Sequence, residues 1–303
     1  MEIKNSNVLI TGGGSGIGMG LVEKFHGLGA KVSIFDLNSD KISPFLNENP
    51  EVLFFQCDIT DVNQLDKSIQ KLFLKLEYID VLINNAGLMS SAPLINFLNP
   101  NERRHSLDLW HKTLDVNLNS VFYVTSYIVE RLIQKRKNGV VVNMSSISSS
   151  GNAGQSAYSA AKAGVEALTK VWSKEFGSMG IRFASVAPGF CNTDGLKESL
   201  NEKVIERWIS NVPLKRLSSI EEIEQALSNA IEFEGPVVVH VLTQKGRGHA
   251  PAEQDSIKHM HDTSGMKSGS YTEAFSEALV KAGESNSKVV AITAAMPDST
   301  GLL

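Results

Sequence analysis

The chain has 303 residues, more than the ~100 to 200 of a typical domain, which predicts one large domain with an additional segment. Its net charge of −4 provides no basic field, so nucleic acid and anionic membranes are not expected partners. Without a signal-like N-terminus or a run of ~18 apolar residues, the expected location is the cytoplasm. Cys57 and Cys191 are too few for a disulfide framework, and the irregularly spaced histidines predict no metal site.

Short β-rich runs alternate with helical patterns along the first two thirds of the chain. The predicted strands are Asn7 to Thr11, Lys31 to Asp36, Val52 to Gln56, Val81 to Asn84, Val140 to Met144 and Arg182 to Val186. The predicted helices are Met19 to Gly29, Asp61 to Leu76, Leu109 to Lys135 and Tyr158 to Met179. This alternation predicts an α/β fold, a doubly wound parallel sheet of Rossmann type that binds ligands at the carboxyl ends of its strands.

A glycine-rich turn, Thr11-Gly-Gly-Gly-Ser-Gly-Ile-Gly18, follows the first predicted strand. Its bare backbone allows a dinucleotide pyrophosphate to approach a helix N-terminus. Asp36 ends the second predicted strand, where a carboxylate binds an adenosine ribose and repels a 2′-phosphate. Because Leu37 and Asn38 follow, with no Arg or Lys, NAD is favoured over NADP as the cofactor. The alternative role for Asp36 is to cap a helix or turn.

Tyr158 and Lys162 stand four residues apart in Tyr-Ser-Ala-Ala-Lys. In a helix they share a face one turn apart, so the lysine cation can stabilise the phenolate. A tyrosine activated in this way can exchange a proton with a carbonyl or alcohol oxygen. The pair therefore predicts hydride chemistry on a carbonyl or secondary alcohol.

Five further motifs accompany the glycine turn and the Tyr158/Lys162 pair. They are Asp58 in Cys-Asp-Ile-Thr, Asn84-Asn-Ala-Gly87, Asn117 in Asp-Val-Asn-Leu, Ser145-Ser146, and Pro188-Gly189 followed by Thr193. Together and in this order, they make residues 1 to about 220 resemble a short-chain dehydrogenase/reductase of the type that includes 3-oxoacyl carrier-protein reductases. The resemblance implies an NAD(P)-dependent oxidoreductase for a small carbonyl or alcohol substrate. It also implies a homodimer or homotetramer whose subunits pair through the helices at 109–135 and 158–179.

The resemblance assigns a role to each matching residue. The implied catalytic residues are Asn117, Ser146, Tyr158 and Lys162. The implied cofactor-binding residues are Thr11, Gly12, Ser15, Gly16, Ile17, Gly18, Asp36, Leu37, Asp58, Ile59, Asn85, Ala86, Gly87, Tyr158, Lys162, Pro188, Gly189 and Thr193. Lys162 is implied to lower the pKa of Tyr158 and to bind the nicotinamide ribose. Strand register selects Ser146 as the catalytic serine, whereas the usual spacing to the tyrosine selects Ser145, and only one of them can face the site.

Two segments are candidates for contact with the substrate. The loop from Met89 to Trp110 carries Arg103 and Arg104, which either bind an anionic tail or form a solvated surface cluster. The stretch from Asp194 to Val212 corresponds to the substrate lid of the family. Its spaced apolar residues predict an apolar underside, which suits a hydrophobic carbonyl compound.

The resemblance ends after Ile223. Residues 227–303 instead resemble an internal fragment of 1-deoxy-D-xylulose 5-phosphate synthase, for example in Gly235-Pro-Val-Val-Val-His-Val-Leu-Thr-Gln-Lys-Gly246. The motif for thiamine diphosphate and its metal and the activating glutamate lie outside the matched fragment, so synthase activity is not expected. We expect two domains, 1–226 and 227–303. In the second, Val237 to Thr243 is expected to replace the missing edge strand, 246–269 to be a linker, and 270–303 to form a helix and a strand.

Two classes of function remain open from the sequence. The first is a working NAD-dependent alcohol dehydrogenase or ketone reductase. The second is a catalytically impaired chimera that retains only dinucleotide binding, because the replaced C-terminus damages the substrate pocket.

Overall fold

The computed structural model describes residues 2–97, 99, 103–189, 191, 209, 216–219, 221–223, 225 and 237–239. The chain divides into two compact units, Met1–Leu242 and Thr243–Leu303, and all the described residues belong to the first. The predicted linker at 246–269 and the predicted helix and strand at 270–303 lie outside them.

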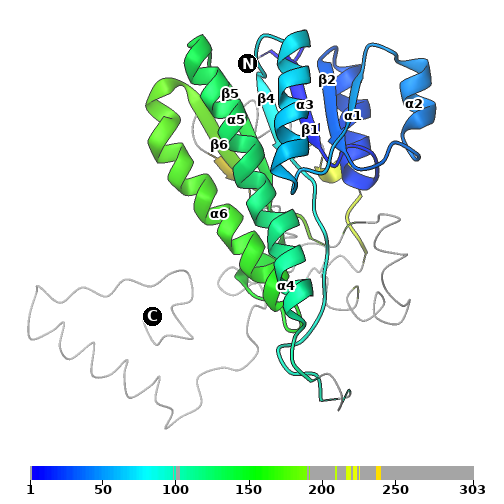
Figure 1. The fold of residues 1–303 in the computed structure, drawn as a ribbon, viewed down its shortest axis with the longest axis vertical. Coiled ribbons are helices and arrows are strands. Elements are labelled where there is room, and N and C mark those ends of the chain that lie inside the picture. The colour runs from blue at the N-terminus through cyan, green and yellow to red at the C-terminus, as the bar shows by residue number, and fades with distance from the viewer. Residues whose placement is uncertain are drawn as a thin grey trace, which may run out of the picture. The chain divides into compact units, whose positions relative to one another are not determined.

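The described residues form an α/β fold around one parallel sheet (Figure 1). Its strands are β1 (Asn7–Thr11), β2 (Lys31–Asp36), β3 (Leu53–Gln56), β4 (Val81–Asn84), β5 (Gly139–Met144), β6 (Ile181–Val186) and β7 (Val237–Val239), in the order β3-β2-β1-β4-β5-β6-β7. Its helices are α1 (Gly16–Gly27), α2 (Ser43–Glu48), α3 (Val62–Lys75), α4 (Leu107–Leu114), α5 (Ser120–Lys135) and α6 (Ser156–Phe176). The order reverses between β1 and β4, which is where such sheets bind ligands.

Helices cover both faces of the sheet. In β1, Val8 and Ile10 pack into a core with α1, whereas Leu9 packs into a second core with α3, α5 and α6. All three side chains are fully buried. Because neighbouring side chains of a strand point to opposite faces, this burial requires cover on both sides. The predicted doubly wound α/β architecture is confirmed.

The single helix predicted from Leu109 to Lys135 is instead three segments. A π-helical segment, Asp115–Asn119, separates α4 from α5. Asn117 lies in this segment, and its buried amide donates to the carbonyl oxygens of Thr113 and Leu88, at 2.9 and 2.8 Å. A hydrogen bond from a side chain to the backbone of its own helix accompanies the wider turn of a π-helix. The spacing of apolar residues in the sequence does not reveal such a turn. The short helix α2 was also not predicted, since it buries no side chain that would create a periodic pattern.

The outer edge of β6 is paired. The backbone of Val237–Val239 runs parallel to it, in the register Ala184↔Val237, Ser185↔Val238 and Val186↔Val239. This is the first part of the segment predicted to dock as an edge strand; its remaining residues, 240–243, lie outside the described part of the chain.

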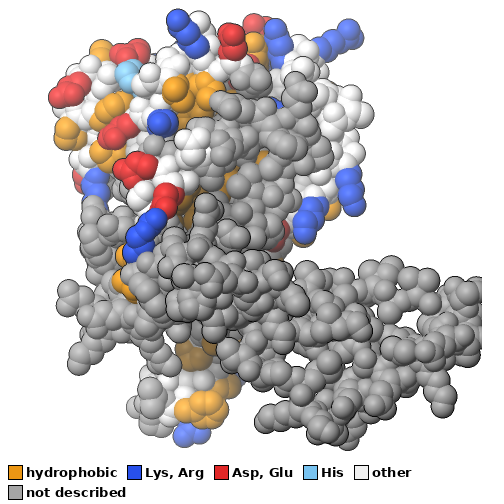
Figure 2. Space-filling view, turned by 180° about the vertical axis from the view of Figure 1, so that it is seen from behind, with side chains coloured by type: hydrophobic (Ala, Val, Ile, Leu, Met, Phe, Trp, Pro, Cys, Tyr) orange, Lys and Arg blue, Asp and Glu red, His pale blue; other side chains and the backbone are white. Residues whose placement is uncertain are grey.

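The surface carries charges of both signs. On the face shown in Figure 2, acidic and basic side chains are interspersed over the described residues, with no continuous basic patch among them. Within the described ranges, no helix has both the length and the apolar character needed to cross a bilayer.

Candidate active site

Two adjoining cavities, of about 450 and 400 Å³, lie at the carboxyl ends of the central strands. Ile17, Asn85 and Gly87 line both of them, so the cavities are halves of one groove. The first half is also lined by the predicted cofactor residues Gly12, Ser15, Gly16, Asp36, Leu37, Asp58, Ile59 and Ala86. The second half is also lined by the predicted site residues Ser146, Tyr158, Lys162, Pro188 and Gly189. Residues from distant parts of the sequence thus meet in one groove.

The glycine turn leaves no room for side chains. Gly12 and Gly16 have φ angles of +67° and +54°, which favour glycine. A Cβ on Gly12 would lie 2.7 Å from the Cα of Ala86, and a Cβ on Gly18 would collide with the carbonyl oxygen of Gly12. The turn therefore exposes bare backbone beside the N-terminus of α1, as a pyrophosphate site requires.

Hydrogen bonds of Thr11 and Asn85 hold the glycine turn in place. The Thr11 hydroxyl accepts hydrogen bonds from the backbone N–H groups of Asn85 and Ala86, at 3.1 and 3.2 Å. The Asn85 amide donates to the carbonyl oxygens of Thr11 and Gly12, at 3.2 and 3.0 Å. Thr11 is buried and does not line the first cavity, so its contribution is to brace the turn.

Asp36 forms the predicted cap, and its predicted contact with a ribose stays a prediction. Its carboxylate accepts hydrogen bonds from the backbone N–H groups of Gly14, at 2.7 Å, and Asn38, at 3.1 Å, and so caps two turns. It also lines the groove, where it can meet a ribose. Lys41 lines the same half of the groove. The prediction of NAD rests on the two residues that follow Asp36 and does not include this cation.

The end of β5 brings the two candidate serines to different neighbours. Both serines line the groove, and a hydrogen bond of the Ser146 side chain acts to lower the pKa of the Tyr158 phenol. The Ser145 hydroxyl donates to Glu166 Oε1, at 2.7 Å. Ser146 is therefore the serine that lies against the predicted acid/base residue.

Burial dominates the protonation of the Tyr158/Lys162 pair. It raises the pKa of the Tyr158 phenol, while the hydrogen bond to Ser146 acts in the opposite direction. Lys162 Nζ lies 5.7 Å from the centre of the Tyr158 ring and donates to the Met144 carbonyl oxygen at 2.8 Å. The net shift is therefore opposite to the expected lowering by Lys162, because desolvation is its largest cause and raises the pKa. Burial also lowers the pKa of Lys162 itself to about 8.

Asn117 lies close behind the groove. Its Oδ1 accepts a hydrogen bond from the Leu88 N–H at 3.1 Å, so its amide holds the backbone of Leu88 through both donor and acceptor. A Cβ on Gly87 would lie 3.0 Å from Asn117 Oδ1 and 3.7 Å from Lys162 Nζ. The bare Gly87 backbone therefore leaves room for the Asn117 amide and lies near the Lys162 ammonium.

The comparisons with known proteins agree with this geometry. The family described as short chain dehydrogenase matches residues 6–204, well over half of the chain. The chain belongs to the short-chain dehydrogenase family. It is 36% identical, over 236 residues, to a 3-oxoacyl-[acyl-carrier-protein] reductase of Thermotoga maritima, which covers 75% of this chain and 90% of the relative. It is 30% identical to the sorbitol-6-phosphate 2-dehydrogenase of Klebsiella pneumoniae, covering 72% of this chain and 80% of that enzyme.

Solved structures of this family have the same fold. A 4-hydroxyisoleucine dehydrogenase complexed with NADH superposes with a TM-score of 0.71 at 25% identity, covering 78% of this chain and 97% of that one. A short chain dehydrogenase from Bacillus anthracis gives a TM-score of 0.69 at 28% identity, covering 79% and 96%. This short-chain dehydrogenase is therefore an NAD(P)-dependent oxidoreductase.

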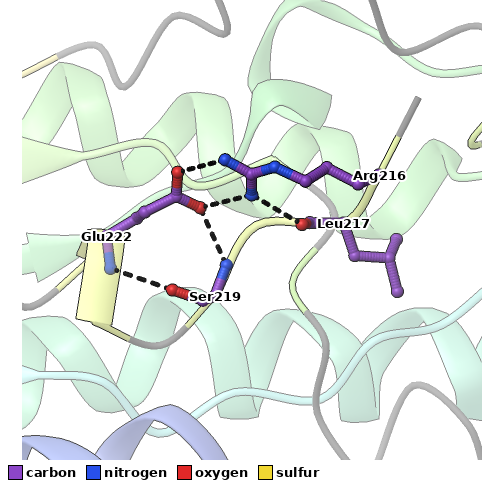
Figure 3. Close-up of polar contacts among 4 residues, drawn as sticks. All are labelled: Arg216, Leu217, Ser219 and Glu222. Atoms are coloured by element: carbon purple, nitrogen blue, oxygen red, sulfur yellow. Dashed lines mark hydrogen bonds and ion pairs between the residues drawn. The ribbon is translucent and has the colours of Figure 1, made fainter. Parts of the chain in front are cut away.

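Polar contacts among Arg216, Leu217, Ser219 and Glu222 hold a segment that packs beside the substrate half of the groove (Figure 3). Arg216 makes a two-pronged ion pair with Glu222, at 2.7 and 2.9 Å, which lowers the pKa of that carboxyl to about 2. Ser219 and Glu222 exchange side-chain and backbone hydrogen bonds, at 2.9 and 3.4 Å, as a capping box does. Ser218, which immediately precedes Ser219, forms an isolated β-bridge with Cys191, which lines the groove.

Other residues of the groove were not predicted. The buried amide of Gln155 lines the substrate half, accepts from the Ser148 hydroxyl at 2.8 Å and donates to Ser91 at 3.3 Å. A lone glutamine before a helix carries no signal by itself. Arg103 and Arg104 are exposed, which fits the solvated-surface alternative. Thr193 and, apart from residue 209, the predicted lid at 194–212 lie outside the described residues.

Proposed function

We propose that this short-chain dehydrogenase transfers a hydride between NAD and a ketone or secondary alcohol, with Tyr158 as its acid and base. The observation that carries the proposal is the Tyr158 phenol beside the Ser146 hydroxyl in the groove that begins at the glycine turn. Since burial raises the pKa of the phenol, it is protonated at neutral pH and can donate in the reductive direction.

The first half of the groove fits a dinucleotide. Its closed glycine turn would hold the pyrophosphate, Asp36 the adenosine ribose, and Asp58 and Ile59 the adenine. Asn85, Ala86 and Gly87 would line the cofactor, and Pro188, Gly189 and Thr193 would border the nicotinamide. When bound, the cofactor supplies or accepts the hydride.

Side chains of the protein bind the substrate oxygen and transfer its proton. The Ser146 hydroxyl holds the substrate oxygen and stabilises the charge that develops on it. Tyr158 gives its proton to that oxygen during reduction, or takes it during oxidation. Buried Lys162 provides the cation that stabilises the phenolate as it forms, and Asn117 fixes the backbone of Leu88 beside it. The apolar lining from Met89, Met144 and Ile147 suits a substrate with a hydrophobic part.

NADH fluorescence titration, followed by a turnover screen of ketones and secondary alcohols, tests the proposal. We expect saturable NADH binding and turnover of at least one carbonyl compound. NADH binding without turnover of any compound would instead favour the impaired chimera. In that chimera the segment at 227–303 would be a structural replacement that damages the pocket. In the proposed enzyme, that segment has no role in the chemistry.

We expect Asp36→Ser to change the cofactor preference. The carboxylate lies in the adenosine half of the groove, where it would repel a 2′-phosphate by about 2 kcal/mol, a factor of about thirty. Its removal ends this repulsion and leaves Lys41 and Asp58 as the charged residues that line this half, so the NADPH/NADH ratio of kcat/KM should rise about thirtyfold. Asp40→Ser removes an exposed carboxylate from the same loop and serves as the control. An unchanged ratio in Asp36→Ser would contradict the assignment of NAD.

We also propose that subunits pair through α5 and α6, which lie side by side in Figure 1. Phe122, Val129 and Ile133 of α5 and Trp172 and Phe176 of α6 line a groove between them. Phe122 is 50% exposed, and Ile133 is 42% exposed. Phe122→Glu should therefore reduce the mass measured by light scattering to that of one subunit, while Leu74→Glu, at an exposed site on α3, should not. A wild-type monomer would refute the pairing.

A further inference from the structure

One face of α6 contacts three consecutive residues at the end of β5. Tyr158, Lys162 and Glu166 follow one another at intervals of four, so they share this face. Tyr158 forms its hydrogen bond with Ser146, and Lys162 donates to the carbonyl oxygen of Met144. Glu166 accepts from Ser145. The first two contacts belong to the proposed proton-transfer machinery, whereas the third has no part in it.

The contact with Glu166 determines the direction of the Ser145 side chain. The buried Ser145 hydroxyl has a single proton and two neighbouring acceptors, Glu166 Oε1 at 2.7 Å and the Lys162 carbonyl oxygen at 3.3 Å. The shorter bond to a carboxylate is the stronger of the two. Ser145 is thus held at Glu166, two turns of α6 from Tyr158.

The backbone passes this constraint to the next residue. The Ser145 N–H donates to the Val186 carbonyl oxygen at 2.7 Å, which extends the pairing of β5 with β6 by one residue. Ser146 is extended, with φ −163° and ψ 155°. Successive side chains of an extended chain diverge. With the Ser145 hydroxyl bound to Glu166, the Ser146 hydroxyl lies beside Tyr158, two turns earlier on the same face of α6, in the groove that both serines line.

We propose that Glu166 is a positioning residue, which binds Ser145 and thereby selects Ser146 as the serine that faces Tyr158. This inference rests on the proposed oxidoreductase function, because it explains how one of two adjacent serines becomes the substrate-binding hydroxyl. Glu166 itself touches neither the Tyr158 phenol nor the groove.

Steady-state kinetics of four variants test the proposal. Glu166→Ala and Ser145→Ala should each lower kcat about tenfold, because a displaced serine disturbs the reacting geometry. Each should leave the KM for NADH within about twofold of the wild type. The double variant should be no slower than either single one, since both remove the same contact. Glu166→Gln keeps an acceptor oxygen and should stay near wild-type kcat.

Lys170→Ala, at an exposed site one turn further along α6, is the matched control and should have no effect. Unchanged kcat in both Glu166→Ala and Ser145→Ala, or losses that multiply in the double variant, would overturn the proposal. If Glu166→Ala does not fold, Ser145→Ala, which removes only one oxygen atom, provides the same test.

Crystal structures separate this proposal from the proposed function. If the wild type turns over none of the screened compounds, the oxidoreductase proposal fails, but the selection of Ser146 can still be examined. The Ser146 hydroxyl should lie within hydrogen-bonding distance of Tyr158 in Glu166→Gln and beyond it in Glu166→Ala. The same Ser146 position in both structures would overturn the role of Glu166.

Discussion

Replacement of Tyr158 by phenylalanine is expected to lower kcat by about 10²- to 10⁴-fold, the usual contribution of a positioned acid or base. The phenol lies in the groove beside Ser146, and its raised pKa keeps the proton available for donation. Phenylalanine keeps the ring and removes only the hydroxyl. NADH affinity, measured by fluorescence titration, should therefore change by less than about threefold.

Tyr127→Phe is the matched control for this variant. Tyr127 is a half-buried tyrosine of α5 whose hydroxyl makes only a long contact, 3.4 Å, with Asp66. Its removal should leave kcat unchanged. Equal kcat in Tyr158→Phe and the wild type would show that another group moves the proton, and would refute the proposed mechanism.

Much of the fold was predictable because burial acts on local sequence. β1, β2 and β4 have the predicted bounds, since their β-branched and apolar runs are buried on both faces and end at polar or glycine residues. The Tyr158/Lys162 pair was predictable because residues four apart on a helix lie on the same face. By contrast, α2 leaves no periodic pattern, and the π-helical segment depends on bonds of the Asn117 amide to the backbone.

The features that sequence could not give depend on distances between remote segments. In our proposal the choice between Ser145 and Ser146 depends on Glu166, which binds Ser145 from 21 residues further along the chain. The presence of Lys41 in the adenosine half depends on the path of the loop after β2. The direction of the Tyr158 pKa shift depends on how deeply the phenol is buried, which no spacing rule measures. For the two serines and Tyr158 the motif named the residue, but packing decided its environment, whereas no motif named Lys41.

Gly18→Ala is expected to abolish NADH binding, with an affinity loss of more than about 100-fold, and to destabilise the fold by about 1–3 kcal/mol. The added methyl group would collide with the carbonyl oxygen of Gly12 and lie 2.5 Å from Asn85 Nδ2. Both atoms take part in the hydrogen bond, 3.0 Å long, that braces the glycine turn. Because one of them belongs to the backbone, the turn itself must move to make room.

Gly27→Ala adds the same methyl group to the same helix, at a position with no atom within 4 Å. Alanine favours the helix over glycine by up to about 1 kcal/mol, so this variant should be as stable as the wild type or slightly more stable. Urea unfolding and NADH titration on the two variants compare the two positions directly. Since the chemical change is identical, a loss confined to Gly18→Ala reports the collision inside the glycine turn. Wild-type NADH affinity in Gly18→Ala would mean that the turn does not hold the cofactor.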